Sequence, residues 1–334
     1  YGIGMFGQLS NQFFLRSCLF YLGKSAGQRS KINHACSGNI LIVRYYYCHQ
    51  RNSKIRRQNY TFRNIMIGNM TNNVFICAMK AVFKVILIYL AIQLPVTLII
   101  GVIPFVRLLH FDYQESILPV LFSILVIDSL TLIYLWKAGY IGKERHTWSF
   151  VSVGWLAFAV LITFPAIFLS DCLLSHLTWL PDIMEQEFER IQSYWFGIIL
   201  ITLIGPVFEE ILFRGAITKL LLKQYAPPKA IVISALLFGI IHGNPVQIIG
   251  AGLIGLLLAW TYYKTASLIP CIIIHVINNS TSVFLTKTYP EADYLKDIMP
   301  KSVYYILLAL FLALLIGAYW GLKKQSSPVT WKQE

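Results

Sequence analysis

The chain has 334 residues, of which 57% are hydrophobic and only 13% are charged, and its mean hydropathy is +0.62. Soluble domains carry about 25% charged residues, so this composition excludes an ordinary soluble fold and favours a polytopic membrane protein. The net charge of +13 is concentrated at the N-terminus, because residues 1–69 contain many Lys and Arg and no acid. The rest of the chain is only mildly basic, which gives no support to nucleic-acid binding.

Residues 1–69 differ from the rest in pattern as well as in charge. They are rich in Asn, Arg, Tyr, Ser and Gln and show no clear helical or strand period, whereas Met70 opens ordinary membrane-protein patterning. We therefore expect residues 1–69 to be a non-native or disordered basic extension, Met70 to be the biological start, and residues 70–334 to form a single membrane domain. The alternative is a basic cytoplasmic extension that contacts anionic lipid.

Eight apolar segments follow one another in this domain. They cover residues 78–105, 116–136, 149–170, 194–218, 229–243, 245–263, 266–285 and 302–322. A helix needs about 20 residues to cross the hydrocarbon core, so the fifth segment is short and depends on its neighbours. The pattern predicts an all-α polytopic transmembrane bundle with about eight spans.

The charges in the connecting loops alternate along the chain. Lysine and arginine follow the second, fourth, sixth and eighth segments, while acidic residues gather after the third and the seventh. Because basic loops stay in the cytoplasm, both termini are expected to be cytoplasmic. The Asn-, Ile-, Lys- and Tyr-rich composition favours the cell membrane of a low-GC Gram-positive bacterium.

Ionised side chains lie inside the fourth segment. Glu209, Glu210 and Arg214 belong to an apolar run, where each charge costs about 2.5–3.5 kcal/mol on insertion scales. Glu210 and Arg214 are spaced i,i+4 and are expected to form a buried ion pair. Glu209 points about 100° away and has no partner on its own helix, which leaves it free for chemistry. A purely structural ion-pair network is the alternative.

Two further polar clusters contain histidine. Phe238 and His242 end the fifth segment, and His275 and Asn279 are spaced i,i+4 in the seventh, with Asn278 turned away. At about 1.5 Å per residue, Glu209 and both histidines lie roughly 15–20 Å from the basic loop of their own segment. This shared depth predicts a common hydrated site within a core of about residues 194–285, although a lone intramembrane histidine is often only a packing donor.

These side chains support hydrolysis of a peptide bond without a nucleophilic Ser or Cys. A carboxylate takes a proton from water, and a histidine orients that water or protonates the leaving amine. A second histidine and an asparagine donate hydrogen bonds to the developing oxyanion. Zinc held by Glu209, His242 and His275 is the alternative, but the HExxH pattern is missing and Asn is a poor zinc ligand. Catalysis without a metal or other cofactor is therefore favoured over Zn²⁺.

The three clusters, read as EExxxR, FxxxH and HxxxN in this order, resemble the CPBP family of CAAX proteases and bacteriocin-processing enzymes, also called the Abi family. Its eukaryotic members are the type II CAAX prenyl endopeptidases. Glu209, Glu210 and Arg214 match the first motif, Phe238 and His242 the second, and His275 and Asn279 the third. The resemblance covers roughly residues 195–285.

The resemblance implies an all-helical intramembrane fold with a cavity open to the cytosol. It implies Glu209 and His242 as activators of the catalytic water and His275 and Asn279 as the oxyanion pocket, with Glu210 and Arg214 as supports. The prenyl-cysteine substrate of the eukaryotic members does not transfer. Bacterial relatives are linked to bacteriocin maturation, self-immunity and processing of peptide signals.

Together these features predict an intramembrane endopeptidase that acts on a membrane-associated or small peptide substrate within the lipid bilayer. One alternative is a catalytically idle scaffold or regulator, which has no need of all seven motif residues. A transporter with midplane carboxylates is another, but the two broken-helix halves that it predicts are not visible in the sequence.

Overall fold

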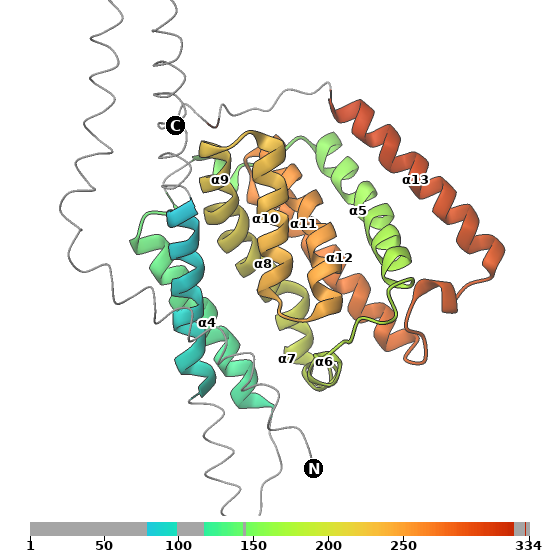
Figure 1. Cartoon of the computed structure of the whole chain (residues 1–334), viewed down its shortest axis with the longest axis horizontal. Helices are drawn as coiled ribbons and strands as arrows, with labels where there is room; N and C mark the ends of the chain where they lie inside the picture. Colours follow the sequence, from blue (N-terminus) through green and yellow to red (C-terminus); the bar gives the residue numbers. More distant parts are fainter. Residues whose placement is uncertain (1–78, 99–116, 143–144, 324–330, 332–334) are drawn as a thin grey trace, which may run out of the picture. The chain divides into compact units, whose positions relative to one another are not determined.

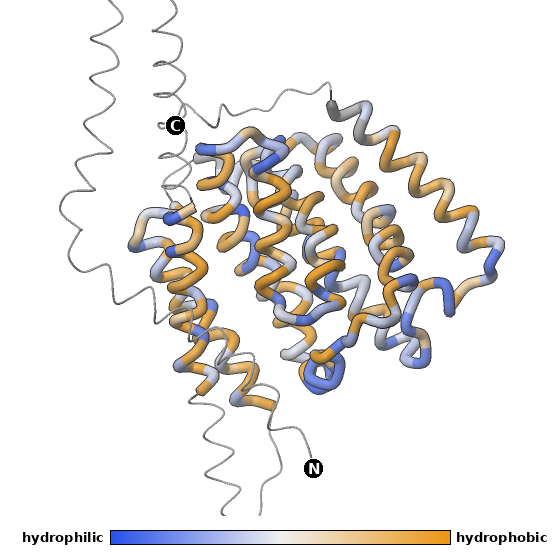
Figure 2. Tube along the Cα trace, viewed as in Figure 1, coloured by the Kyte–Doolittle hydropathy of each residue, from blue (hydrophilic) through white to orange (hydrophobic). Residues whose placement is uncertain are grey.

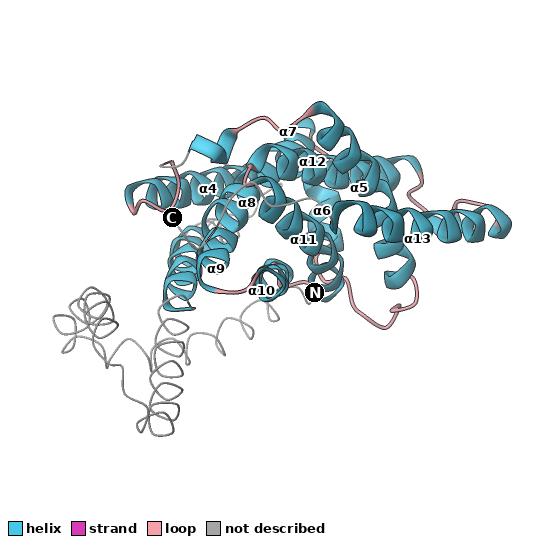
Figure 3. Cartoon of the chain, turned by 90° about the horizontal axis from the view of Figure 1, so that it is seen from above, coloured by secondary structure: helices cyan, strands magenta, loops and turns pink. Residues whose placement is uncertain are grey.

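The computed structural model describes residues 79–98, 117–142, 145–323 and 331, all within the compact unit Asn69–Glu334. Every regular element in these ranges is a helix, and the ranges contain no strand (Figures 1 and 3). The predicted all-α class is therefore confirmed. The expectation that residues 1–69 are an extension and that Met70 is the start lies outside the described residues.

Eight apolar helices in this part of the chain correspond to the eight predicted segments. In chain order they are Met79–Leu98, α4 (Leu118–Lys137), α5 (Val153–Leu174), the composite helix Trp195–Gln224, α10 (Pro227–Ile241), α11 (Pro245–Thr265), α12 (Leu268–Thr288) and α13 (Lys301–Lys323). Seven are long and apolar enough to cross a bilayer, whereas α10 has only 15 residues. This agrees with the short fifth segment expected from the sequence, and the chain is an integral membrane protein.

The composite helix is not α-helical throughout. It runs through α7 (Trp195–Ile199), η3 (Leu200–Ile204), α8 (Gly205–Glu210), η4 (Ile211–Thr218) and α9 (Lys219–Gln224). The segments η3 and η4 are π-helical, so two widened stretches flank the short α8 that carries both adjacent glutamates. Widened turns of this kind recur at functional sites, because they re-aim side chains without ending the helix.

Local sequence explains where several helices begin and end. Prolines in the first turn start α4, α10 and α11, where the missing N–H costs no intrahelical bond. The Ser267 hydroxyl accepts a hydrogen bond from the Ile269 N–H and caps α12. Just before it, Ala266 adopts a left-handed conformation with a φ of 52° and ends α11.

The described helices bury a main apolar core and a smaller apolar cluster, and they turn apolar faces outward. The core gathers side chains of the first described helix, α4, the composite helix, α10, α11 and α12. The outer faces of α4 and α13 stay hydrophobic, as expected for lipid contact (Figure 2). The short helix α6 (Glu185–Gln192), which precedes the composite helix, is strongly polar (Figure 2).

The acidic loops meet one another on one side of the bundle. The Asn244 side chain, between α10 and α11, donates to Asp182 Oδ1 over 2.8 Å and accepts from the Ile183 N–H over 3.2 Å. The Asp171 carboxylate, near the end of α5, accepts from the Leu295 N–H over 3.1 Å. The α5–α6 loop therefore lies beside the α10–α11 turn, and the end of α5 lies beside the α12–α13 loop.

The basic loops meet on the opposite ends of the same helices. Lys219 Nζ donates to the Tyr140 carbonyl over 2.6 Å, which joins the end of the composite helix to the α4–α5 loop. The Ser267 hydroxyl donates to the Ser149 carbonyl over 2.6 Å. The two groups of loops are the basic and the acidic loops that the sequence predicts on opposite sides of the membrane. We propose that the lysine-rich side faces the cytoplasm.

Candidate active site

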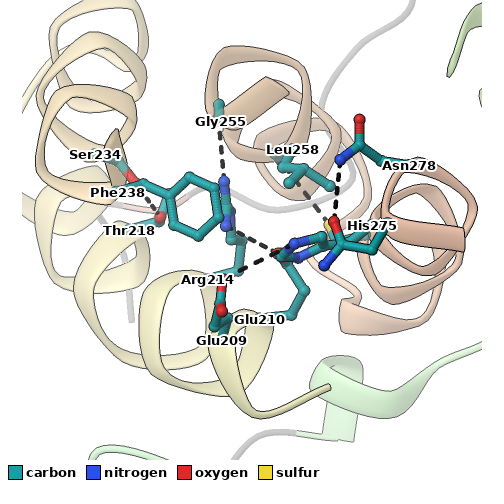
Figure 4. A network of polar contacts seen from close by, with 12 residues as sticks. Glu209, Glu210, Arg214, Thr218, Ser234, Phe238, Gly255, Leu258, His275 and Asn278 are labelled. Carbon is teal, nitrogen blue, oxygen red and sulfur yellow. Dashed lines mark hydrogen bonds and ion pairs between the residues drawn. The ribbon is translucent and has the colours of Figure 1, made fainter. Parts of the chain in front are cut away.

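Glu210 and Arg214 form the buried centre of the site (Figure 4). Arg214 Nη1 donates to Glu210 Oε1 over 2.9 Å, and both side chains are 0% exposed. Arg214 Nη2 donates to the Gly255 carbonyl over 3.2 Å, which ties the pair to α11. The sequence predicted this i,i+4 pair, and the structure contains it. Glu210 Oε2 and Arg214 Nε are buried without a hydrogen-bond partner among the described residues, so part of the hydrogen-bonding capacity of the pair is unused.

His275 joins the same carboxylate from α12. Its Nδ1 lies 2.8 Å from Glu210 Oε1, and the side chain is nearly fully buried. Because a carboxylate only accepts hydrogen bonds, Nδ1 must carry a proton in this contact. The contact fixes the ring plane and leaves Nε2 directed at the neighbouring glutamate.

Phe238 provides the apolar wall of the site. Its ring lies under the guanidinium of Arg214, with Cζ 4.4 Å from the ring centroid. The same ring makes edge contacts with the imidazoles of His242 and His275, at centroid distances of 5.1 and 5.7 Å. A single buried aromatic side chain therefore contacts the cation and orients both histidines.

Glu209 faces both histidines. Its Oε2 lies 3.8 Å from Nε2 of His242 and 3.8 Å from Nε2 of His275. These distances are too long for a direct hydrogen bond, yet Oε2 is buried and has no hydrogen-bond partner. The side chains of Glu209 and His242 as a whole are 29% and 21% exposed, which leaves them accessible from one side.

The hydrogen bond at Nδ1 sets the tautomer of His242. Nδ1 lies 2.7 Å from the carbonyl of Phe238, which only accepts, so the Nδ1 proton is donated there. In the neutral ring Nε2 is then a hydrogen-bond acceptor. A water molecule placed between Nε2 and Glu209 Oε2 would find an acceptor for each of its two protons.

The Asn279 amide makes two hydrogen bonds to other residues. Asn279 Nδ2 donates to the Ile201 carbonyl, in the π-helical η3, over 2.9 Å. Asn278, expected to be turned away, donates instead to Asn279 Oδ1 over 3.0 Å. Asn279 therefore has its amide plane fixed by two neighbours, with one Nδ2 hydrogen left for another acceptor.

Close packing of α10 against α11 brings the Gly255 carbonyl to Arg214. A Cβ at Gly255 would lie 3.0 Å from Phe238 Cδ1 and 3.3 Å from the Ala235 backbone, and a Cβ at Gly239 would clash with the Ile248 carbonyl. Both positions therefore require glycine because α10 and α11 approach each other too closely for a Cβ atom, and not because of an unusual backbone conformation. Small residues serve the same purpose in other membrane helix pairs.

We predict that Gly255→Ala destabilises the protein by about 1–3 kcal/mol and lowers its activity, because the added methyl group pushes Phe238 away from Arg214. Thermal unfolding in detergent micelles measures the first effect. Gly154→Ala in α5 is the matched control, since a Cβ there meets nothing within 4 Å. Equal unfolding temperatures for the two variants would contradict the packing argument.

Two polar residues near Glu209 were not singled out from the sequence. Asp128 lies on the buried face of α4, and Tyr89 lies on the helix Met79–Leu98; both interact electrostatically with Glu209. A lone acidic residue inside an apolar span was the available signal for Asp128, since such residues usually mark functional sites. Asp128 has no partner at helical spacing, so its proximity to Glu209 could not be predicted from the sequence.

The donor types of the site also fit zinc. Glu209, His242 and His275 would hold the ion, and each histidine already has the Nδ1 hydrogen bond that metal-ligating imidazoles usually make. In the described ranges, however, no group of three or more His, Cys, Asp or Glu side chains is arranged closely enough to hold a metal. When bound, zinc would supply a Lewis acid that lowers the pKa of its water.

Comparison with protein families identifies the same region. Residues 191–281 match the family model described as type II CAAX prenyl endopeptidase Rce1-like. Comparison with curated proteins and with solved structures gave no significant match. The matched segment contains all seven motif residues, from Glu209 to Asn279. Residues 191–281 are therefore similar to the Rce1-like type II CAAX prenyl endopeptidase family, which supports the resemblance to the CPBP group of CAAX proteases.

Proposed function

We propose that this membrane protein is an intramembrane endopeptidase in which Glu209 and His242 activate a water molecule. The observation that carries the proposal is the position of Glu209 Oε2, buried without a hydrogen-bond partner and 3.8 Å from both imidazole Nε2 atoms. A single water fits between groups at such separations, and it would donate to both Glu209 and His242. Its lone pair would then be free to attack.

The reaction follows from these contacts. The water oxygen attacks the carbonyl carbon of the scissile peptide bond, while Glu209 takes one proton from the water as general base. Collapse of the tetrahedral intermediate breaks the C–N bond, and Glu209 returns the proton to the leaving nitrogen. The products are a carboxylic acid and an amine, and Glu209 is regenerated as a carboxylate.

We assign the stabilisation of the oxyanion to His275 and Asn279. The second Nδ2 hydrogen of Asn279 is available for this purpose, because the first is donated to Ile201. His275 must present an N–H at Nε2, which gives the ring a positive charge while Nδ1 remains bonded to Glu210. The Glu210 carboxylate is placed to offset that charge, in the way that a buried Asp supports the histidine of a serine protease.

The substrate that we propose is a membrane-associated or small peptide, cleaved without the prenyl group that the family description names. Bacteriocin processing, signal-peptide processing and self-immunity are the physiological settings that we favour, in a bacterial cell membrane with both termini in the cytoplasm. An intramembrane site suits a substrate that partitions into lipid, because the bilayer itself concentrates such a peptide next to Glu209.

His242→Ala is expected to lower kcat by about 10²–10⁴, since it removes one of the two acceptors of the catalytic water. Cleavage of a peptide library by purified protein in lipid nanodiscs measures this loss. His176→Ala is the control, because the His176 ring hydrogen-bonds to the Cys172 carbonyl and the Ser175 hydroxyl at the end of α5. A chelator is expected to leave the wild-type rate unchanged.

Two outcomes would replace this proposal. Loss of cleavage with a chelator and recovery with Zn²⁺ would assign the same three residues to a zinc site. An unchanged cellular phenotype of both His242→Ala and Glu209→Gln would favour a catalytically idle scaffold or regulator.

A further inference from the structure

Asp128 is a buried carboxyl group in the middle of a membrane span. It lies on the inward face of α4 with Leu121 and Leu135, which are one heptad before and one heptad after it, and is only 9% exposed. No hydrogen bond or ion pair joins it to another described residue. Carboxylates at this depth are costly and usually pair with a cation, so one without a cation among the described residues requires an explanation.

The position of α4 brings Asp128 to the catalytic glutamate. Leu121 packs with Leu200 near the start of the composite helix, and Leu135 belongs to the core shared with its later turns. Asp128 lies seven residues beyond Leu121, and Glu209 nine residues beyond Leu200, so the two carboxyls share a depth. Their electrostatic interaction is consistent with this register.

Tyr89 approaches the same place from the first described helix. Val82, Val85 and Tyr89 share one face, and this face packs on the core. The Tyr89 ring lies 6.1 Å, centroid to centroid, from that of Phe208, the residue before Glu209. Its hydroxyl interacts electrostatically with both Glu209 and Asp128. Two carboxyls and an aromatic ring therefore converge from three different helices.

The local charges do not balance. Asp128 interacts with Glu209, whereas the Arg214 guanidinium and the proposed positive charge of His275 are both bonded to Glu210. The lysines on the surrounding described helices are directed elsewhere: Lys80, Lys84 and Lys137 are exposed, and Lys219 donates to the Tyr140 carbonyl. The region next to the scissile-bond site is therefore complementary to a positive charge.

We propose that Asp128, with Glu209 and the Tyr89 ring, forms a subsite for a protonated amine of the peptide substrate, either a lysine side chain or a free N-terminus. The inference rests on the proposed endopeptidase function and specifies its substrate class. Carboxylates and an aromatic face are the groups that recognise ammonium ions. A cation bound there would also offset the negative charge of Asp128.

Binding of matched peptides tests the subsite without depending on cleavage. The set consists of short apolar peptides with one lysine at each position in turn and an acetylated N-terminus, the same peptides with norleucine, and norleucine peptides with a free N-terminus. Affinities are measured from thermal stabilisation of the protein in nanodiscs of zwitterionic lipid. We expect one cationic series to bind wild type about ten-fold more tightly than its neutral match.

Asp128→Asn is expected to reduce this preference to less than two-fold while it preserves the fold, because it removes a charge from the membrane without changing shape. Asp128→Leu, which replaces the carboxyl by an apolar group, is expected to lose the preference as well. Ser123→Ala is the control, since the Ser123 hydroxyl hydrogen-bonds to the Val120 carbonyl of its own helix. Equal affinities of wild type for cationic and neutral peptides, or a preference that survives both Asp128 substitutions, would overturn the inference.

The test of the subsite can fail or succeed independently of the test of the proposed endopeptidase function. Loss of the cation preference in Asp128→Asn while Glu209→Gln still cleaves would support the subsite and refute the glutamate mechanism. An intact preference in Asp128→Asn while Glu209→Gln is inactive would refute the subsite alone.

Discussion

Glu209→Gln is expected to lower kcat by about 10³ or more while the protein still folds and inserts. Glutamine has the shape of glutamate, but its amide cannot take a proton from the water held near His242 and His275. Because Glu209 Oε2 makes no hydrogen bond to another described residue, the substitution breaks no described hydrogen bond at that oxygen. Single-turnover cleavage of a peptide substrate in nanodiscs measures the loss.

The control for this substitution is a glutamate outside the site. Glu185→Gln, in the exposed helix α6, makes the same chemical change on the acidic side of the bundle. It should leave kcat within two-fold of wild type. A Glu209→Gln protein that keeps more than a tenth of the wild-type rate would exclude Glu209 as the general base.

Arg214→Met is expected to cost about 3–5 kcal/mol of stability, because it leaves the fully buried Glu210 without its cation. It also removes the hydrogen bond to the Gly255 carbonyl and the contact with the Phe238 ring. Unfolding in mixed micelles, followed by tryptophan fluorescence, measures the change. Arg214→Lys should recover part of the loss, since an ammonium pairs with Glu210 but cannot reproduce the planar contacts.

The double substitution Glu210→Gln/Arg214→Met separates stability from activity. With both charges removed, most of the unfolding free energy should return, because neither member of the Glu210–Arg214 pair is left buried without the other. Activity should not return, since His275 then loses the carboxylate that supports its Nδ1 proton. An Arg214→Met protein as stable as wild type would show that the pair is not a structural support.

The spans and the internal pair of the fourth helix could be predicted because their signals are local. Hydropathy alone located eight helices, and the i,i+4 spacing of Glu210 and Arg214 was enough to predict their contact. The convergence of Glu209, His242 and His275 was predicted from their similar depth in the membrane. Helices that cross the same bilayer can be compared by the distance of each residue from the membrane surface.

Other features depend on contacts between distant segments. Asp128 and Glu209 are far apart in sequence, and no spacing rule links them. Asn244 has the sequence position of a helix cap, yet its side chain bonds Asp182 and Ile183 instead of its own helix. The π-helical turns on either side of α8 were likewise not predicted from the sequence.

A double-mutant cycle on Glu209 and His242 tests most directly whether the two act on one water molecule. If they do, each single substitution already abolishes water activation, and Glu209→Gln/His242→Ala should be no slower than the worse single variant. Rate losses that multiply in the double variant would mean that the two side chains act independently, and would contradict the shared site.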